Sequence, residues 1–219
     1  MPPLAANTVV STAVTDLVNA LVILPMLMHL RRVLPRAEQQ GHLWHKLLWQ
    51  IALCSLLGFV LHIYPWTYVP LAGIWIVLYA ILLEGLHSFL SLPLQTFLDG
   101  KSSKPVSWLL RGAEFIMLAV LTLCILLRRN PIRLCVLYGV AIAVPSVFFH
   151  ARLAQQGHTG ARIFLTAFIP QIPGLVAQIA RQNAHSFLGL DFNGFYHVCL
   201  LASLIIFYFS ALHWQPRTK

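Results

Sequence analysis

The sequence predicts an all-α, polytopic membrane protein, a bundle of seven transmembrane helices. Of its 219 residues, 58% are hydrophobic and only 10% are charged, and the mean hydropathy is +0.76. A soluble domain carries about a quarter charged residues. Apolar runs of about eighteen residues or more recur along the whole chain, as in proteins with repeated membrane helices. A β-barrel is excluded, because its strands would alternate apolar and polar residues.

Seven spans with short connections predict a single membrane domain over residues 1–219. They are expected at about 8–28, 47–64, 68–93, 107–127, 132–150, 162–181 and 194–213, close to the roughly twenty residues that a bilayer requires. No basic region precedes the first, so it is interpreted as a span and not as a cleaved signal. Pro145 in the fifth span and Pro170 and Pro173 in the sixth predict kinks, since proline removes a helical hydrogen bond.

The basic residues lie at the ends of the predicted spans and set the expected orientation. One side collects Arg31, Arg32, Arg36, Lys46, Lys101, Lys104, Arg111, Arg152, Arg162, Arg217 and Lys219, and the other Arg128, Arg129, Arg133 and Arg181. This bias predicts a cell (inner) membrane protein with its N-terminus outside and its C-terminus in the cytoplasm. The formal charge of +9 then indicates topology and contact with lipid headgroups, and no nucleic-acid partner is expected.

Polar residues inside the spans are the candidates for function, because a charge at the bilayer centre is costly. In the first span, Thr12, Asp16 and Asn19 recur at i, i+4 and i+7, so they line one helix face that must look into the bundle. For Thr12 and Asn19, hydrogen bonding between helices is the favoured interpretation. For Asp16, a functional role is favoured.

Two histidines are expected in the same half of the bundle as Asp16. His62 lies near the outer end of the second span, where snorkelling to the interface is the alternative interpretation. His197 lies about 6 Å inside the last span at 1.5 Å per residue, and Asn193 precedes it by one turn on the same face. His185 and Asp191, in the preceding loop, are possible covers for this group.

A second polar group is predicted at the inner end. Glu84 and His87 are spaced i, i+3 in the third span, as are Arg111 and Glu114 in the fourth. As antiparallel neighbours they could form a network of two carboxylates and two cations. A structural clamp is favoured, with proton or substrate handling as the alternative. The four lysines (Lys46, Lys101, Lys104 and Lys219) are expected outside the spans, which argues against a retinal Schiff base.

Two histidines and a carboxylate are a minimal ligand set for Zn²⁺ or Fe²⁺, and a zinc-bound water is a source of hydroxide for cleaving amides or esters. The leading hypothesis is therefore a metal-dependent intramembrane hydrolase acting on a lipid-like amide or ester. His62 and His197 would bind the metal, Asp16 would be a third ligand or a general base, and Asn193 would orient the substrate or oxyanion. The competing hypothesis is a non-enzymatic binder or transporter of a lipid or small amphiphile that uses the same residues for hydrogen bonding.

The architecture resembles the CREST superfamily, which includes alkaline ceramidases and adiponectin/progestin receptors. The resemblance lies in the seven spans, the histidine near the end of the second and the polar-x3-His motif that opens the seventh. That family's pattern is Ser-x3-His in the second span, an aspartate in the third and His-x3-His in the seventh, with three histidines on zinc. His62 and His197 match two of these histidines. Gly58 stands in place of the serine and Asn193 in place of the third histidine, so the motif match is partial.

Overall fold

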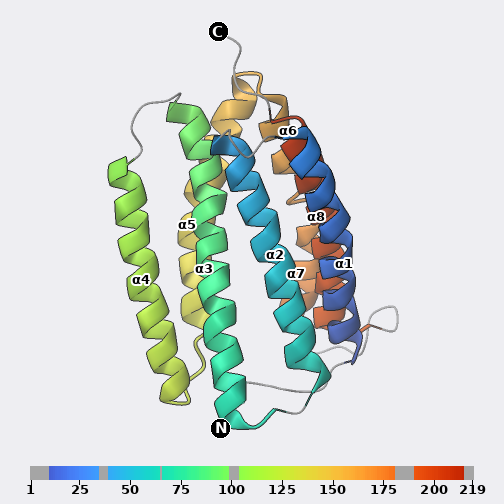
Figure 1. The fold of residues 1–219 in the computed structure, drawn as a ribbon, viewed down its shortest axis with the longest axis vertical. Coiled ribbons are helices and arrows are strands. Elements are labelled where there is room, and N and C mark those ends of the chain that lie inside the picture. Colours follow the sequence, from blue (N-terminus) through green and yellow to red (C-terminus); the bar gives the residue numbers. More distant parts are fainter. Residues whose placement is uncertain (1–9, 35–38, 65, 99–103, 181–189, 215–219) are drawn as a thin grey trace.

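The computed structural model describes residues 10–34, 39–64, 66–98, 104–180 and 190–214. Within these ranges the chain forms helices that run roughly along one long axis (Figure 1). In chain order they are α1 (Val10–Val33), α2 (Gln39–Ile63), α3 (Tyr68–Leu98), α4 (Lys104–Leu126), α5 (Ile132–Gln155), α6 (Thr159–Thr166), α7 (Gln171–Ala180) and α8 (Phe192–Leu212).

These helices provide seven segments long and apolar enough to cross a membrane, with α6 and the first part of α7 forming one of them. The predicted fold class is therefore confirmed, and the chain is an integral membrane protein. Because the number of crossings is odd, α1 begins at one end of the bundle and α8 finishes at the other (Figure 1). The first is the α1-start end of the bundle and the second is the α8-finish end.

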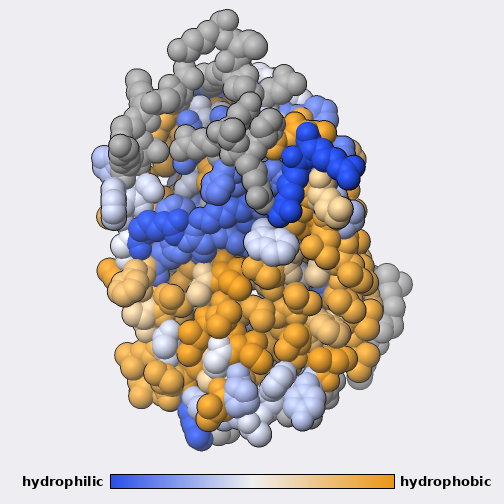
Figure 2. All heavy atoms as spheres, in the orientation of Figure 1, coloured by the Kyte–Doolittle hydropathy of each residue, from blue (hydrophilic) through white to orange (hydrophobic). Residues whose placement is uncertain are grey.

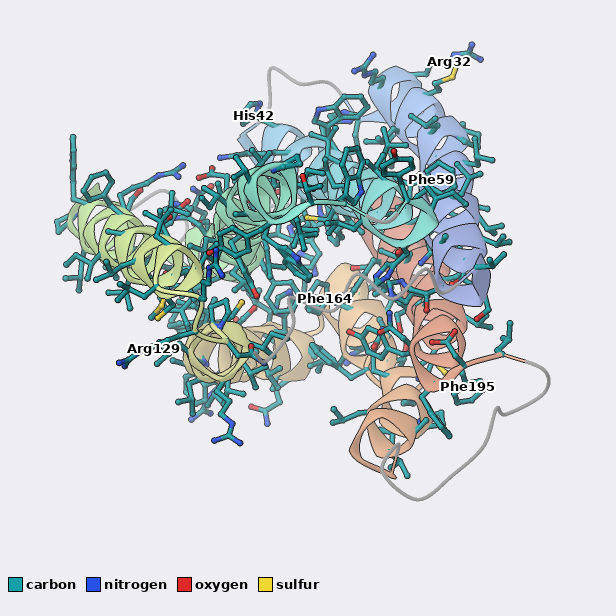
Figure 3. The ribbon with its side chains drawn as sticks, turned by 90° about the horizontal axis from the view of Figure 1, so that it is seen from below. Arg32, His42, Phe59, Arg129, Phe164 and Phe195 are labelled. Atoms are coloured by element: carbon teal, nitrogen blue, oxygen red, sulfur yellow. The ribbon has the colours of Figure 1, made fainter. Side chains whose placement is uncertain are left out.

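The order of packing brings the first and last helices together. α1 packs against α2 and α8, α3 packs against α2, α4 and α5, and α6 and α7 both pack against α8. Viewed along the helices, α4 stands at one edge of the bundle, and α1 with α8 at another (Figure 3). Within the described ranges, α4 has substantial packing against α3 and only slight packing against α5.

The α8-finish end has an aromatic core. Trp44, Phe164 and Trp214 are buried, and the Trp44 ring makes T-shaped contacts with each of the other two; Phe164 lies near the middle of the bundle (Figure 3). The His150 ring stacks on Phe164 with its centroid 3.6 Å away. His45 and His158 are also buried. From the sequence, both histidines were expected in loops or at interfaces and therefore solvated. This prediction is wrong, because His45 lies within α2 and the His158 ring packs on Trp214 with a centroid distance of 4.6 Å.

Several predicted boundaries need correction, and α1 and α5 each run five residues past their predicted ends. α2 begins at Gln39 and not near residue 47, because Trp44, Leu47 and Leu48 are buried while polar neighbours lower the local hydropathy. α3 runs five residues past residue 93, since the helix continues through Pro93. α5 likewise continues through Pro145.

The sixth predicted span is broken, as its prolines indicate. α6 ends at Thr166 and α7 begins at Gln171, with turns over 167–170 that include Pro170. Gln171 then donates a hydrogen bond through Nε2 to Ser203 Oγ of α8 at 2.8 Å. The break therefore places a polar side chain at the interface of α7 with α8.

Candidate functional site

The candidate site lies where α1, α2 and α8 meet near the α1-start end. Its central contact joins Asp16 of α1 to His197 of α8, with Oδ1 and Nδ1 2.7 Å apart. The Asp16 side chain is 1% exposed and that of His197 is 15% exposed. The sequence predicted a common depth for these residues, and the structure brings them into contact across 181 positions of chain.

The pair is a close contact between a carboxylate oxygen and a ring nitrogen, and it is an ion pair only when His197 is protonated. Among the described residues, neither Nδ1 of His197 nor Oδ2 of Asp16 has a hydrogen-bond partner. A buried carboxylate normally accepts hydrogen bonds at both oxygens. The pair therefore has spare capacity for a donor from water or from a bound molecule.

The other two residues of the predicted stripe hold α8 against α1. Thr12 and Asn19 are buried with Asp16, so the stripe faces the interior as expected. Thr12 Oγ1 donates to the carboxylate of Asp191 at 2.9 Å, and Asn19 Nδ2 donates to the backbone oxygen of His197 at 3.2 Å. These interhelical bonds agree with the structural roles expected for both residues, and the second one also fixes the backbone that carries the histidine.

Asp191 caps the N-terminus of α8. Its carboxylate accepts hydrogen bonds from the backbone N–H groups of Asn193 and Gly194, each at 3.2 Å, and from the hydroxyls of Ser11 and Thr12. Burial raises the pKa of the Asp191 carboxyl, but these hydrogen bonds outweigh that effect and leave the pKa below its ordinary value. Asp191 therefore fixes the start of α8, and with it the height of His197. The other residue expected to cover the site, His185, lies outside the described residues.

Gly58 of α2 forms the third wall of the site. A Cβ atom placed on this glycine would lie 2.5 Å from Oδ2 of Asp16 and 2.9 Å from its Cγ. The carboxylate therefore occupies the space that any side chain at position 58 would fill. Sequence reasoning singled out Gly58 only as a departure from a serine motif and did not connect it with Asp16.

His62 lies one helical turn from Gly58, and Asn193 one turn from His197. His62 follows Gly58 by four residues and so shares its face of α2, in the last turn of the helix. Asn193 precedes His197 by four residues in the first turn of α8. In the described part of the chain, no three His, Cys, Asp or Glu side chains form a group that could hold a metal. Of the predicted ligands, the structure joins Asp16 with His197.

The predicted group of Glu84, His87, Arg111 and Glu114 also forms, and Lys46 joins it. Arg111 of α4 bonds both carboxylate oxygens of Glu84 on α3, with Nη2 to Oε1 at 2.8 Å, and its Nη1 lies 3.0 Å from Oε2 of Glu114. Nδ1 of His87 lies 3.5 Å from Oε2 of Glu114. Lys46 of α2 also pairs with Glu84. Lys46, Glu84, Arg111 and Glu114 are called the ion network below.

The structure places Lys46 within α2, and not before the helix as the predicted span boundary implied. Because α2 starts eight residues earlier than predicted, Lys46 falls in its second turn and faces α3. Glu84 thus links α2 and α4 through one carboxylate. This arrangement favours the structural interpretation of the group.

A family comparison covers nearly the whole bundle. The family model that matches spans residues 11–216, which includes Asp16, Gly58, His62, Asn193 and His197. The chain belongs to DUF6962, a family of unknown function. No curated protein and no solved structure matches it. Function in this DUF6962 protein is therefore argued from the site itself.

Proposed function

We propose that this protein is an intramembrane hydrolase of a lipid-like amide or ester, with His197 as the general base. The observation that carries the proposal is the buried contact between Asp16 Oδ1 and His197 Nδ1. Nδ1 makes no aligned hydrogen bond to the described residues of the free protein, but catalytic hydrogen bonds often align only when substrate binds. A carboxylate this close to Nδ1 then favours the tautomer with its proton on that nitrogen and leaves the lone pair on Nε2. Within the described residues, no side chain or backbone group hydrogen-bonds to Nε2.

The reaction follows from this tautomer. Nε2 of His197 takes a proton from water as the water oxygen bonds to the substrate carbonyl carbon, and the carbonyl π electrons move to its oxygen. The Asp16 carboxylate stays ionised and stabilises the imidazolium through Nδ1. The Asn193 side chain, one turn away, is proposed to donate a hydrogen bond to the oxyanion. As the bond to the leaving nitrogen or oxygen breaks, Nε2–H returns the proton to that atom.

Zinc is a separate proposal. A zinc-bound water would supply hydroxide at neutral pH, with His62 and His197 as ligands. However, the described residues give no three-ligand group, and Asp16 is placed to orient His197 as outer-shell carboxylates do. The residues as arranged do not complete a zinc site, so the proton transfers above use only the chain's own groups. Elemental analysis of the purified wild type and of Asn193→His tests for the metal, because the variant adds a nitrogen one turn from His197. Zinc in the wild type, or zinc gained by the variant, supports the zinc proposal. No zinc in either protein rejects it.

The test of hydrolysis uses purified full-length protein with fluorogenic long-chain amides and esters. His197→Ala should abolish turnover, and Asp16→Asn should lower kcat by about 10²–10⁴-fold, the usual contribution of general base catalysis. His29→Gln is the matched control, because His29 bonds Tyr208 near the far end of α1. Equal turnover by His197→Ala and the control would reject the proposal.

One observation favours the binding alternative. Among the described residues, none donates a hydrogen bond to the buried Oδ2 of Asp16, and the hydroxyl or amide of a bound amphiphile could supply one without any chemistry. Saturable binding of a long-chain amide that Asp16→Asn weakens, with no product formed by the wild type, would establish this alternative.

A further inference from the structure

The ion network forms a polar surface on the membrane-spanning helices, remote from the Asp16–His197 pair. It joins α2, α3 and α4, and its cations reach outward: the Arg111 side chain is 42% exposed and that of Lys46 is 27% exposed. On the face formed by these helices, a hydrophilic band borders a broad apolar belt (Figure 2). Charges facing hydrocarbon are costly, so exposed cations need polar surroundings.

The length of the apolar segments places these surroundings at the bilayer surface. From Lys46 to the end of α2 at Ile63 is about 26 Å, from Tyr68 to Glu84 on α3 about 24 Å, and from Arg111 to the end of α4 at Leu126 about 23 Å, at 1.5 Å per residue. All three are shorter than a hydrocarbon core of about 30 Å. The corresponding apolar segment of α1, from Val10 to Arg31, is longer, at about 31 Å.

Exposed tryptophans flank the ion network. Trp49 lies three residues after Lys46 and is 45% exposed, and Trp108 lies three residues before Arg111 and is 78% exposed. Tryptophan gathers at the level of lipid headgroups. The opposite end of the same face carries Tyr64, which is exposed, and Arg128, whose guanidinium packs on the Tyr68 ring at 4.5 Å.

We propose that phospholipid headgroups reach the ion network on the α2–α3–α4 face, where the lipid phosphate binds Arg111 and Lys46. The bilayer is then locally thinner beside these helices than beside α1, because a short apolar segment draws the interface inward. Arg111 suits this contact, since a guanidinium has five donors and the described contacts to Glu84 and Glu114 use its Nη atoms. This inference does not depend on hydrolysis.

The first measurement locates the membrane boundary without altering the ion network. The full-length protein is reconstituted in phosphatidylcholine dibrominated either near the ester end or near the middle of the acyl chain. The difference in fluorescence between the wild type and Trp108→Phe gives the signal of Trp108. Bromines near the ester end should quench this signal more than bromines near the middle of the chain. Trp75 is the control, because it lies on α3 about 13 Å deeper in the bilayer than Glu84 of the ion network, at 1.5 Å per residue. It should be quenched more by the deep bromines. Equal or stronger quenching of Trp108 by the deep bromines would overturn the proposal.

The second measurement tests for the phosphate. The Tm is compared in dioleoyl phosphatidylcholine and in a dioleoyl galactolipid that lacks phosphate, and the wild type should be more stable in the phospholipid. Arg111→Gln and Glu84→Gln both break the pair between these residues, but only Arg111→Gln removes a phosphate donor. The lipid-dependent difference in Tm should vanish in Arg111→Gln and persist in Glu84→Gln. No difference in the wild type, or its loss in both variants, would contradict phosphate binding.

Discussion

At the scale of single residues, the site depends on how closely Gly58 lets α2 approach Asp16. The stripe of Thr12, Asp16 and Asn19 follows from helical periodicity, so sequence alone predicted that it faces inward. The contact between Asp16 and His197 could be predicted only as a shared depth, because pairing across the chain depends on which helices become neighbours. The close approach at Gly58 carries a weak sequence signal, since a glycine within an apolar helix has many structural explanations.

Substitution of Gly58 should therefore be far more damaging than substitution of a helical glycine with open space around it, such as Gly112. In Gly58→Ser the new side chain would overlap Asp16 Oδ2, so we expect a lower Tm and loss of turnover. Gly112→Ser is the control, because nothing lies within 4 Å of a Cβ at Gly112. Thermal unfolding of both variants checks this, and equal Tm values for the two would show that α1 and α2 do not approach as described.

Asp191 should make the start of α8 sensitive to acid. Its carboxyl has a lowered pKa in the folded protein, so the stability that it contributes is present above the ordinary pKa of about 3.9 and is lost as the pH falls through the lowered folded value. We expect the Tm of the wild type to fall in that acidic range and the Tm of Asp191→Asn to change less there. Parallel Tm–pH curves for the two proteins would contradict this role.

At the scale of elements, the apolar cores of the helices were predictable and their ends were less so. Hydropathy identifies all seven membrane segments, but it places the start of α2 too late because polar residues near Gln39 precede buried ones such as Trp44 and Leu48. The pairing of Lys46 with Glu84 was missed for the same reason. The break before Gln171 was expected, since Pro170 and Pro173 stand close together.

The ion network should be important for the attachment of α4, which packs mainly on α3. Glu84→Gln leaves Arg111 and Lys46 without their shared carboxylate. The cost should fall between the roughly 0.2–1 kcal/mol of an exposed pair and the 3–5 kcal/mol of a broken buried one. Thermal unfolding in detergent should show a lower Tm with unchanged turnover per folded molecule. Lost turnover at an unchanged Tm would instead favour a role in proton or substrate handling.

At the scale of the whole molecule, the odd number of crossings and the uneven distribution of basic residues determine the expected orientation. Arg31, Arg32, Arg152 and Arg162 lie toward the α8-finish end, and Arg128, Arg129 and Arg133 toward the other. Cytoplasmic segments of membrane proteins are the richer in lysine and arginine. The α8-finish end is therefore expected to face the cytoplasm, and the Asp16–His197 pair to lie in the outer half.

A reporter protein fused after Lys219 tests this orientation directly. A fluorescent protein that matures only in the cytoplasm should be bright at this position, whereas alkaline phosphatase, which is active only outside, should be silent. The reverse result would place the candidate site in the inner half of the membrane.

The contact between the first and last helices also constrains how the protein is made. Asp16 enters the membrane with α1, but His197 is synthesised 181 residues later. At roughly 5–20 residues per second this interval lasts about 10–35 s. Throughout it, α1 carries a carboxyl group without its eventual partner, at an insertion cost of about 2.5–3.5 kcal/mol while charged. Release of α1 into lipid thus carries this cost until α8 arrives, and the contact between Asp16 and His197 is among the last to form as the protein is made.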